Sequence, residues 1–236
     1  MKLPLVALGI AAAGALLLAI AGPAYRVGVP LPSALAVFRL GGHAGLAAGL
    51  LGLLAAGLAY RHQLRRAVAA GALAAVAGLA VFTVALVAQR RADTAPPLHD
   101  VSTDLENPPA FAAIVPLRGE TDNTLERAPI MTEQQRNAYP GLQPLTLAMP
   151  AEQAYDRSLA VAQEKGWEIV TADKSAGRIE ATDTTTWFGF QDDVVVRVTP
   201  WGAGARIDVR ASARTGRSDS GRNARRIADF LASLEP

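Results

Sequence analysis

Three long apolar stretches at the start of the chain constrain the fold more than any other feature of the sequence. They are Leu3–Gly22, Leu40–Tyr60 and Ala67–Ala88. Each has 20 residues or more, enough to cross the roughly 30 Å hydrocarbon core of a bilayer as a helix. The first 91 residues contain no Asp or Glu, and His43 is the only ionisable side chain well inside a stretch. The sequence therefore predicts a membrane anchor of three transmembrane helices in residues 1–91.

The loop between the second and third stretches predicts how the anchor is oriented. Arg61–Arg66 holds three arginines, and such loops stay on the cytoplasmic side of the membrane. Three spans then place the N-terminus inside the cell and everything after Ala88 outside. A cleaved signal peptide is the alternative interpretation of the first stretch, because Lys2 precedes its apolar core and Ala19-Ile20-Ala21 lies near its end. The C-terminal part lies outside the cytoplasm under both interpretations.

Glycines spaced four residues apart mark one face of the second stretch. Gly41, Gly45 and Gly49 follow this spacing, and Gly57 lies two turns further along the same face. Small residues at this spacing let helix backbones approach closely in lipid. We expect a packing seam among the three helices, with a dimer interface as the alternative.

The rest of the chain has the composition of an acidic, soluble domain. Residues 92–236 contain 15 basic and 21 acidic side chains, for a net charge of −6. Nucleic acid is therefore an unfavourable partner, since phosphate binding relies on positive charge. The chain has no cysteine, which excludes disulfides, thiolate metal sites and cysteine nucleophiles.

A proline-rich segment, residues 92–144, joins the anchor to the domain. Proline at this density does not sustain a regular helix or a central strand. We expect Thr132–Gln135 to be the capping box of one short helix that ends near Ala138. The rest of the segment should run in extended form across the domain, with Phe111 and Ile114 tucked against it.

Residues 145–236 predict an α+β domain of two layers. Alternation of apolar and polar residues, typical of strands with one buried face, is clearest in Arg178–Asp183 and Asp193–Thr199. The other expected strands are Leu145–Ala148, Trp167–Thr171 and Ala205–Ala213, and the expected helices are Pro150–Lys165 and one that Ser218 or Ser220 caps and that reaches Leu234. This order of elements predicts an antiparallel sheet with two helices on one face.

Several motifs in this part of the chain recur together in one bacterial family. They are HDVSTD, NPPAF, GRIEATDTTTWFGFQDDVVVRV and RIDVRASARTGRSDSGRNARRI. On these motifs the chain resembles the family known as domain of unknown function 1499, over roughly Leu98–Leu234. The resemblance implies a fold and a location in the cell envelope, and it implies no catalytic residues.

One histidine and four aspartates are the candidates for catalysis. They are His99, Asp100, Asp104, Asp192 and Asp193. His99 could serve a hydrolase triad with Ser102, Ser212 or Ser218 as nucleophile, although Ser218 sits where a helix cap is expected. The same set could offer ligands to a metal, but no recognised ligand spacing is present. We expect no metal and no cofactor, and we favour a non-enzymatic protein with the hydrolase as the alternative.

Two surfaces are candidates for binding. One loop carries Trp187, Phe188 and Phe190, which would plug the core if buried and would contact lipid or a partner if exposed. The polar residues after this loop favour recognition over core packing. The second surface is the sheet face opposite the helices, onto which five charged side chains should project: Glu180, Arg197, Arg206, Asp208 and Arg210. We expect a solvated cross-strand network there, with a seat for residues 99–111 or for an anionic ligand as the alternatives.

These features favour a multi-pass protein of the bacterial inner membrane whose periplasmic C-terminal domain binds a protein, lipid or cell-wall partner. The lipid bilayer is the first partner that the anchor implies. Two alternatives remain: a hydrolase built on His99 and nearby carboxylates, and a subunit that helps a membrane complex assemble through its glycine-rich helices. The oligomeric state stays open.

Overall fold

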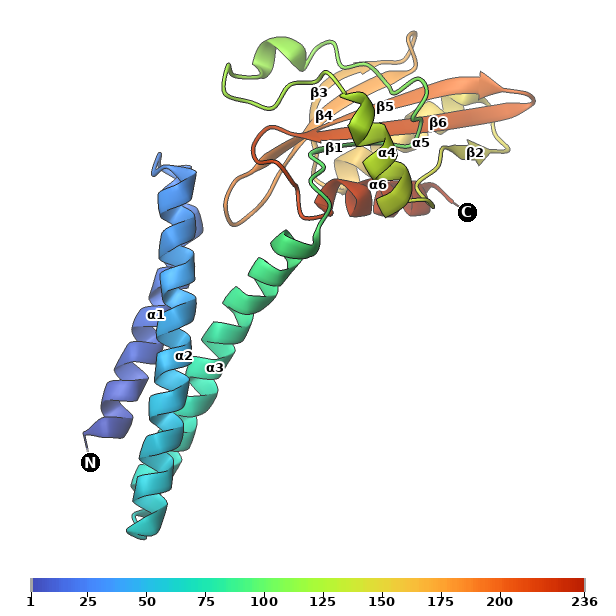
Figure 1. Ribbon diagram of the computed structural model, residues 1–236. Helices are drawn as coiled ribbons and strands as arrows, with labels where there is room; N and C mark the ends of the chain where they lie inside the picture. Colours follow the sequence, from blue (N-terminus) through green and yellow to red (C-terminus); the bar gives the residue numbers. More distant parts are fainter. Residues whose placement is uncertain (1, 236) are drawn as a thin grey trace. The chain divides into compact units, whose positions relative to one another are not determined.

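The computed structural model describes residues 2–235 and divides the chain into two compact units (Figure 1). The first unit comprises Met1–Asp93 together with Thr186–Gly189. The second comprises Thr94–Thr185 and Phe190–Pro236. The short stretch at 186–189 therefore belongs with the helices, although it lies far from them in the sequence.

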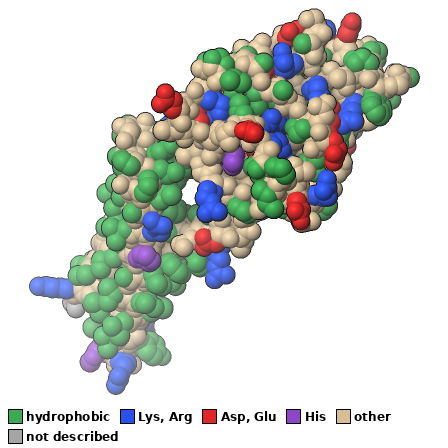
Figure 2. Space-filling view, turned by 45° about the horizontal axis from the view of Figure 1, so that its top comes forward, with side chains coloured by type: hydrophobic (Ala, Val, Ile, Leu, Met, Phe, Trp, Pro, Cys, Tyr) green, Lys and Arg blue, Asp and Glu red, His purple; other side chains and the backbone are tan. Residues whose placement is uncertain are grey.

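Three long helices make up most of the first unit: α1 (Leu3–Arg26), α2 (Leu31–Arg61) and α3 (Arg65–Thr94). All three are long and apolar enough to cross a membrane. Figure 2 shows their surface covered by hydrophobic side chains, whereas charged side chains of both signs are spread over the other unit. The predicted architecture, three apolar helices followed by a domain with an antiparallel sheet, is confirmed.

Glycines bring the backbones of the three helices close together. A Cβ atom on Gly41 would lie 2.7 Å from the carbonyl oxygen of Gly14 in α1. On the other side of α2, a Cβ on Gly45 would lie 2.8 Å from the carbonyl oxygen of Gly78 in α3. The predicted seam is therefore confirmed, since only glycine fits contacts this close. A Cβ atom on Gly57 would meet no atom of another helix within 4 Å, so Gly57 is not part of the seam.

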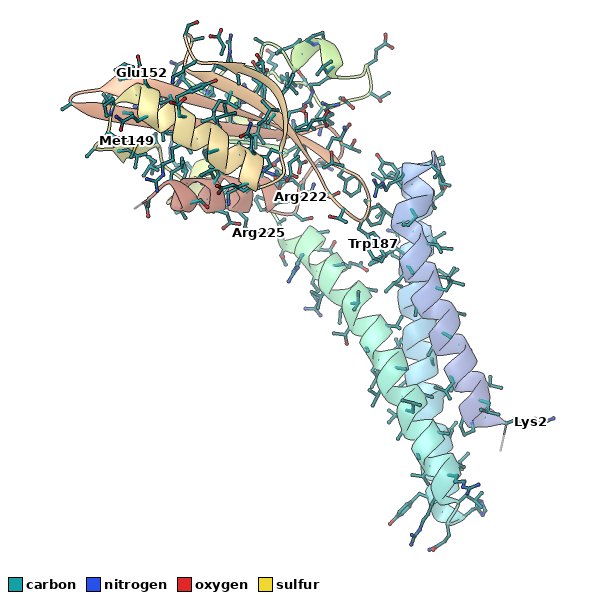
Figure 3. The ribbon with its side chains drawn as sticks, turned by 180° about the vertical axis from the view of Figure 1, so that it is seen from behind. Lys2, Met149, Glu152, Trp187, Arg222 and Arg225 are labelled. Atoms are coloured by element: carbon teal, nitrogen blue, oxygen red, sulfur yellow. The ribbon has the colours of Figure 1, made fainter. Side chains whose placement is uncertain are left out.

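The second unit is built on a 6-stranded antiparallel sheet. Its strands are β1 (Asp100–Ser102), β2 (Leu145–Leu147), β3 (Glu168–Asp173), β4 (Arg178–Thr184), β5 (Gln191–Trp201) and β6 (Gly204–Ala213). The order is β1-β6-β5-β4-β3, and β2 also pairs with β6. Helices α5 (Ala151–Glu164) and α6 (Arg222–Leu234) cover one face, as predicted, and Figure 3 shows them in front of the sheet.

Alternate residues of the long strands form the core under these two helices. Val194, Val196 and Val198 of β5 are buried there, as are the facing apolar residues of β6. On the helix side, Phe230 stacks on Trp167 with ring centroids 5.1 Å apart. Each buried side chain of this size contributes roughly 1.5–3 kcal/mol to folding, so this face is the main source of stability.

The start of α6 differs from the prediction, because the N-cap residue is Gly221 rather than Ser218 or Ser220, and Asp219, two residues before it, binds the first N–H groups of the helix. The Asp219 carboxylate accepts hydrogen bonds from the backbone N–H groups of Gly221 (2.8 Å) and Asn223 (2.7 Å). Ser218 Oγ instead donates to the carbonyl of Pro96. A buried carboxylate at this position satisfies two of the N–H groups that a helix start leaves without partners.

The short helix α4 (Pro129–Ala138) begins three residues before the predicted capping box, so that part of the prediction is wrong. Pro129 occupies its first turn, where the missing N–H costs nothing. Gln135 points inward and pairs with the edge strand β1: its Oε1 accepts from the N–H of Ser102 (3.0 Å) and its Nε2 donates to the Ser102 carbonyl. One amide side chain thus replaces a neighbouring strand at this edge.

Candidate functional site

The sheet face opposite α5 and α6 is covered by the chain between β1 and α4. Glu180 of β4, the strand next to the edge strand β3, lies on this face and is fully buried. Its carboxylate accepts hydrogen bonds from the backbone N–H groups of Ala112 and Ile114, both at 2.9 Å. Phe111 and Ile114 pack with Val195 into a small second core. The prediction that these two residues tuck against the domain is confirmed. The prediction of a solvated charge network is wrong for Glu180, Asp208 and Arg210, which are buried, whereas Arg197 and Arg206 stay partly exposed.

Two buried carboxylates under this cover are each held by two arginines. Asp100 binds Arg210, with Nη2 at 2.8 Å from Oδ2, and also contacts Arg127. The Arg210 guanidinium lies 5.1 Å from the centroid of the Phe111 ring. Charges this deeply buried are tolerated only when they are paired and hydrogen-bonded. Both oxygens of Asp100 meet this condition, whereas the Nε atom of Arg127 has no partner among the described residues.

Asp193 shows the same arrangement further along the face. Arg118 reaches it from the covering segment at 2.6 Å, and Arg214 reaches it from beyond β6 at 2.8 Å. Thr182 adds a hydrogen bond from its hydroxyl at 2.8 Å. The covering segment is therefore tied to the sheet by ionic contacts as well as by apolar ones.

Asp192 points to the opposite face of the sheet from Asp193, because successive side chains alternate along a strand. It binds Arg222 at 2.8 Å and Arg226 at 2.7 Å, both from α6. The four candidate aspartates thus lie in separate ion-pair clusters. Within residues 2–235, no group of three or more His, Asp or Glu side chains is placed to hold a metal ion.

His99 is half-buried just before β1. Its backbone carbonyl accepts from the Ala213 N–H at 2.8 Å, and its side-chain Nε2 is enclosed without a hydrogen-bond partner among the described residues. Burial lowers the pKa of His99, because it disfavours the charged imidazolium, and the nearby Asp100 partly opposes this shift. Of the three candidate nucleophiles, the Ser102 and Ser218 hydroxyls donate to backbone carbonyls, whereas the Ser212 hydroxyl is buried and has no partner among residues 2–235.

One part of the outward face stays open, at the hairpin end of β5 and β6. A depression of about 300 Å³ lies there, which we call the Trp201 depression. Its lining residues come from β5, β6 and the turn after β1: Asp104, Asn107, Arg197, Thr199, Trp201, Arg206 and Asp208. The antiparallel register pairs Arg197 with Asp208 and Thr199 with Arg206, so these side chains share one face.

Two arginines and two aspartates alternate around the base of the depression. Asp208 accepts from Arg197 and from Arg206, each with Nη2 at 3.0 Å. Asp104 accepts from the same two Nη2 atoms, at 3.1 and 3.0 Å. The Nε atoms of both arginines also donate to Asp208. Both guanidinium planes are therefore fixed by fork-like contacts, which orient them more firmly than single hydrogen bonds would.

The outer parts of these side chains remain accessible. The side chains of Arg197 and Arg206 are 24% and 25% exposed, and their Nη1 atoms have no hydrogen-bond partner within the described part of the chain. Trp201 is 55% exposed, with the Arg206 guanidinium 5.4 Å from its ring centroid. The depression thus combines oriented donors with an accessible aromatic ring.

A comparison with known families identifies the family of the domain that carries this face. The family model described as "Protein of unknown function (DUF1499)" matches residues 100–234, more than half of the chain. The chain belongs to the DUF1499 family. The match confirms the resemblance that the sequence motifs suggested, and it begins at β1, after the three helices. No curated protein matches the chain.

The aromatic loop of the DUF1499 domain is divided between the two units. Phe188 lies in the first unit, with its ring 6.3 Å from that of Tyr25 and 6.4 Å from that of Phe38. Trp187 lies in the same unit against Gly22 and is labelled in Figure 3. Phe190 belongs to the second unit, where the Arg222 guanidinium lies 5.8 Å from its ring centroid.

Two residues of the DUF1499 domain that line the Trp201 depression, Trp201 and Asn107, are not among the binding residues predicted from the sequence. Trp201 has no role in the sequence-based prediction, yet it continues the period of two set by Arg197 and Thr199 and so reaches the same face. That spacing could have identified it. Nothing in the sequence around Asn107 indicates that its carbonyl accepts from Arg197.

Proposed function

We propose that this DUF1499 protein is a multi-pass protein of the bacterial inner membrane whose periplasmic C-terminal domain binds a ligand without catalysis. One observation carries the proposal. Each candidate catalytic aspartate is occupied by two arginines, whereas the Trp201 depression keeps donors and an aromatic ring accessible. Residues 1–91 serve as the anchor, residues 92–144 as the cover of the sheet, and residues 145–236 as the body of the domain.

The ion pairs argue against acid–base chemistry at these aspartates. A general base needs a free lone pair within about 3 Å of the proton that it removes. In Asp193, both oxygens already accept from Arg118, Arg214 or Thr182. Asp193 is therefore suited to holding the covering segment in place and not to accepting a proton from a substrate.

Two observations support the proposed location. Arg61, Arg65 and Arg66 lie at the turn between α2 and α3, where the positive-inside rule favours the cytoplasm. With three spans, the chain after α3 then lies on the periplasmic side. The glycine seam is occupied by contacts among the helices themselves, which favours an anchor over an assembly subunit.

Reporter fusions test this proposal. Alkaline phosphatase, which is active only outside the cytoplasm, should be inactive when fused after Arg66 and active when fused after Arg91. A green fluorescent protein should give the opposite result at the same two positions. The triple variant Arg61→Ala, Arg65→Ala, Arg66→Ala should weaken this asymmetry. Phosphatase inactive at both positions would refute the periplasmic location.

A further inference from the structure

We propose that the Trp201 depression binds an uncharged saccharide, by stacking a sugar ring on Trp201 and by donating hydrogen bonds to sugar oxygens from Arg197 and Arg206. This inference rests on the proposed binding function and specifies the ligand class of the same site.

The charge of the depression favours a neutral ligand. Arg197 and Arg206 are balanced by Asp104 and Asp208, which contact them at 3.0–3.1 Å. The surrounding residues 92–236 carry a net charge of −6, which repels anions at low ionic strength. An oxyanion would therefore meet no net positive charge either at the site or around it.

The hydrogen-bonding groups that remain free are mostly donors. The carboxylates of Asp104 and Asp208 already accept hydrogen bonds from the two arginines. Asp104 also accepts from the backbone N–H groups of Glu106 and Asn107. The Nη1 groups of Arg197 and Arg206 carry two N–H donors each and have no partner among residues 2–235. Thr199 lies in the same lining and adds a hydroxyl, which can both donate and accept. Neighbouring hydroxyl groups of a sugar match this set, since their oxygens accept and their protons can be donated to Thr199.

Trp201 supplies the apolar part of the site. Trp167, in the same unit, is buried, but Trp201 is more than half exposed beside the polar groups just described. An indole presents a flat apolar face with a polar edge, and the C–H face of a pyranose ring packs well on such a surface. The volume of about 300 Å³ is at the small end of the range for ligand sites, so a short stretch of glycan fits better than a large cofactor.

The test uses the full chain, purified in a polyoxyethylene detergent because this detergent carries no sugar. Three neutral probes, the tetrasaccharides of N-acetylglucosamine, cellulose and starch, are titrated at millimolar concentration and followed by calorimetry and tryptophan fluorescence. Acetate and inorganic phosphate are titrated in the same way. At least one tetrasaccharide should bind saturably, and its affinity should be nearly independent of salt, since no net charge is neutralised.

Three variants and a matched control locate the binding. Trp201→Ala should weaken the affinity about tenfold, the effect of losing one stacked aromatic contact, and Trp201→Phe should weaken it less. Arg206→Lys keeps the charge but loses the fork geometry, and should also weaken binding. Trp187→Ala is the control, because Trp187 is similarly exposed (50% against 55% for Trp201) and lies outside the depression.

Three results would overturn the inference: no binding of any tetrasaccharide, unchanged affinity in both Trp201 variants, or binding of phosphate or acetate that weakens steeply with salt. The last result would identify an oxyanion site. None of these results depends on the side of the membrane on which the domain lies. The reporter fusions can therefore fail while the saccharide titration succeeds, and the reverse is equally possible.

Discussion

Replacement of Glu180 by glutamine should detach the covering segment from the sheet. Glu180 is fully buried and accepts from the N–H groups of Ala112 and Ile114 at 2.9 Å each, with Arg178 Nε at 3.5 Å. Glutamine keeps the shape but has one acceptor oxygen instead of two. One of the two backbone N–H groups would therefore face an NH₂ group and lose its acceptor.

The expected cost follows from this change. A buried donor left without an acceptor costs about 1–3 kcal/mol, and the loss of negative charge weakens the remaining hydrogen bond. We expect Glu180→Gln to lower the free energy of unfolding by about 2–4 kcal/mol. The matched control is Glu106→Gln: Glu106 is 88% exposed at its side chain and pairs with Arg136 at 3.5 Å. This control should change stability by less than about 0.5 kcal/mol.

Urea unfolding of the purified full chain, followed by tryptophan fluorescence, measures both values. Limited proteolysis should in addition cut the Glu180→Gln variant between residues 103 and 128 faster than it cuts the unmodified chain. A Glu180→Gln variant as stable and as resistant as the Glu106→Gln control would show that this carboxylate does not hold the cover.

Three further predictions concern other parts of the molecule. Burial raises the pKa of Asp219, so the folded chain binds this proton more firmly than the unfolded chain does. The contribution of Asp219 to the free energy of unfolding should therefore fall as the pH rises above 3.8, the usual pKa of this group. In unfolding measured against pH, Asp219→Asn should flatten this dependence, whereas Ser220→Ala should not. Burial lowers the pKa of His99, so the contribution of this histidine to the free energy of unfolding should be lost as the pH falls below 6.5. His99→Ala should remove that part of the acid sensitivity, and a His99→Ala variant with the same pH profile as the unmodified chain would contradict this prediction. Gly45→Val places a side chain against the backbone of α3 and should destabilise the helices by about 1–3 kcal/mol in thermal unfolding in detergent. Gly57→Ala places its side chain in open space and should not destabilise them, so equal effects of the two variants would show that the seam is unimportant.

The long, regular elements could be predicted from the sequence, because their periodicity reflects the packing of one face. Val194, Val196 and Val198 alternate with polar or outward residues, and the structure buries all three under the helices. The three apolar helices followed equally directly from length and composition. The short strand β1 could not be predicted, since three residues carry no period and its pairing partner in β6 lies more than 100 residues away.

The candidate site was less predictable because its members come from distant segments. Alternation indicated that Glu180, Arg197 and Arg210 share a face, but the cover that buries part of that face is held by backbone N–H groups, which every residue except proline has. The pairing of Asp104 with Arg206 joins positions 102 residues apart in the sequence. Only the fold shows which arginines are occupied and which keep free donors.

Labelling of single cysteines tests the account most directly, because the chain has no cysteine of its own. Ala203→Cys places a thiol in the exposed hairpin turn beside the Trp201 depression, and His62→Cys places one in the exposed turn between α2 and α3. A maleimide that cannot cross membranes is applied to cells with a permeable outer membrane. If the domain is periplasmic, Ala203→Cys reacts before lysis and His62→Cys reacts only after it. Labelling of His62→Cys before lysis, with Ala203→Cys protected, would contradict the periplasmic binding domain.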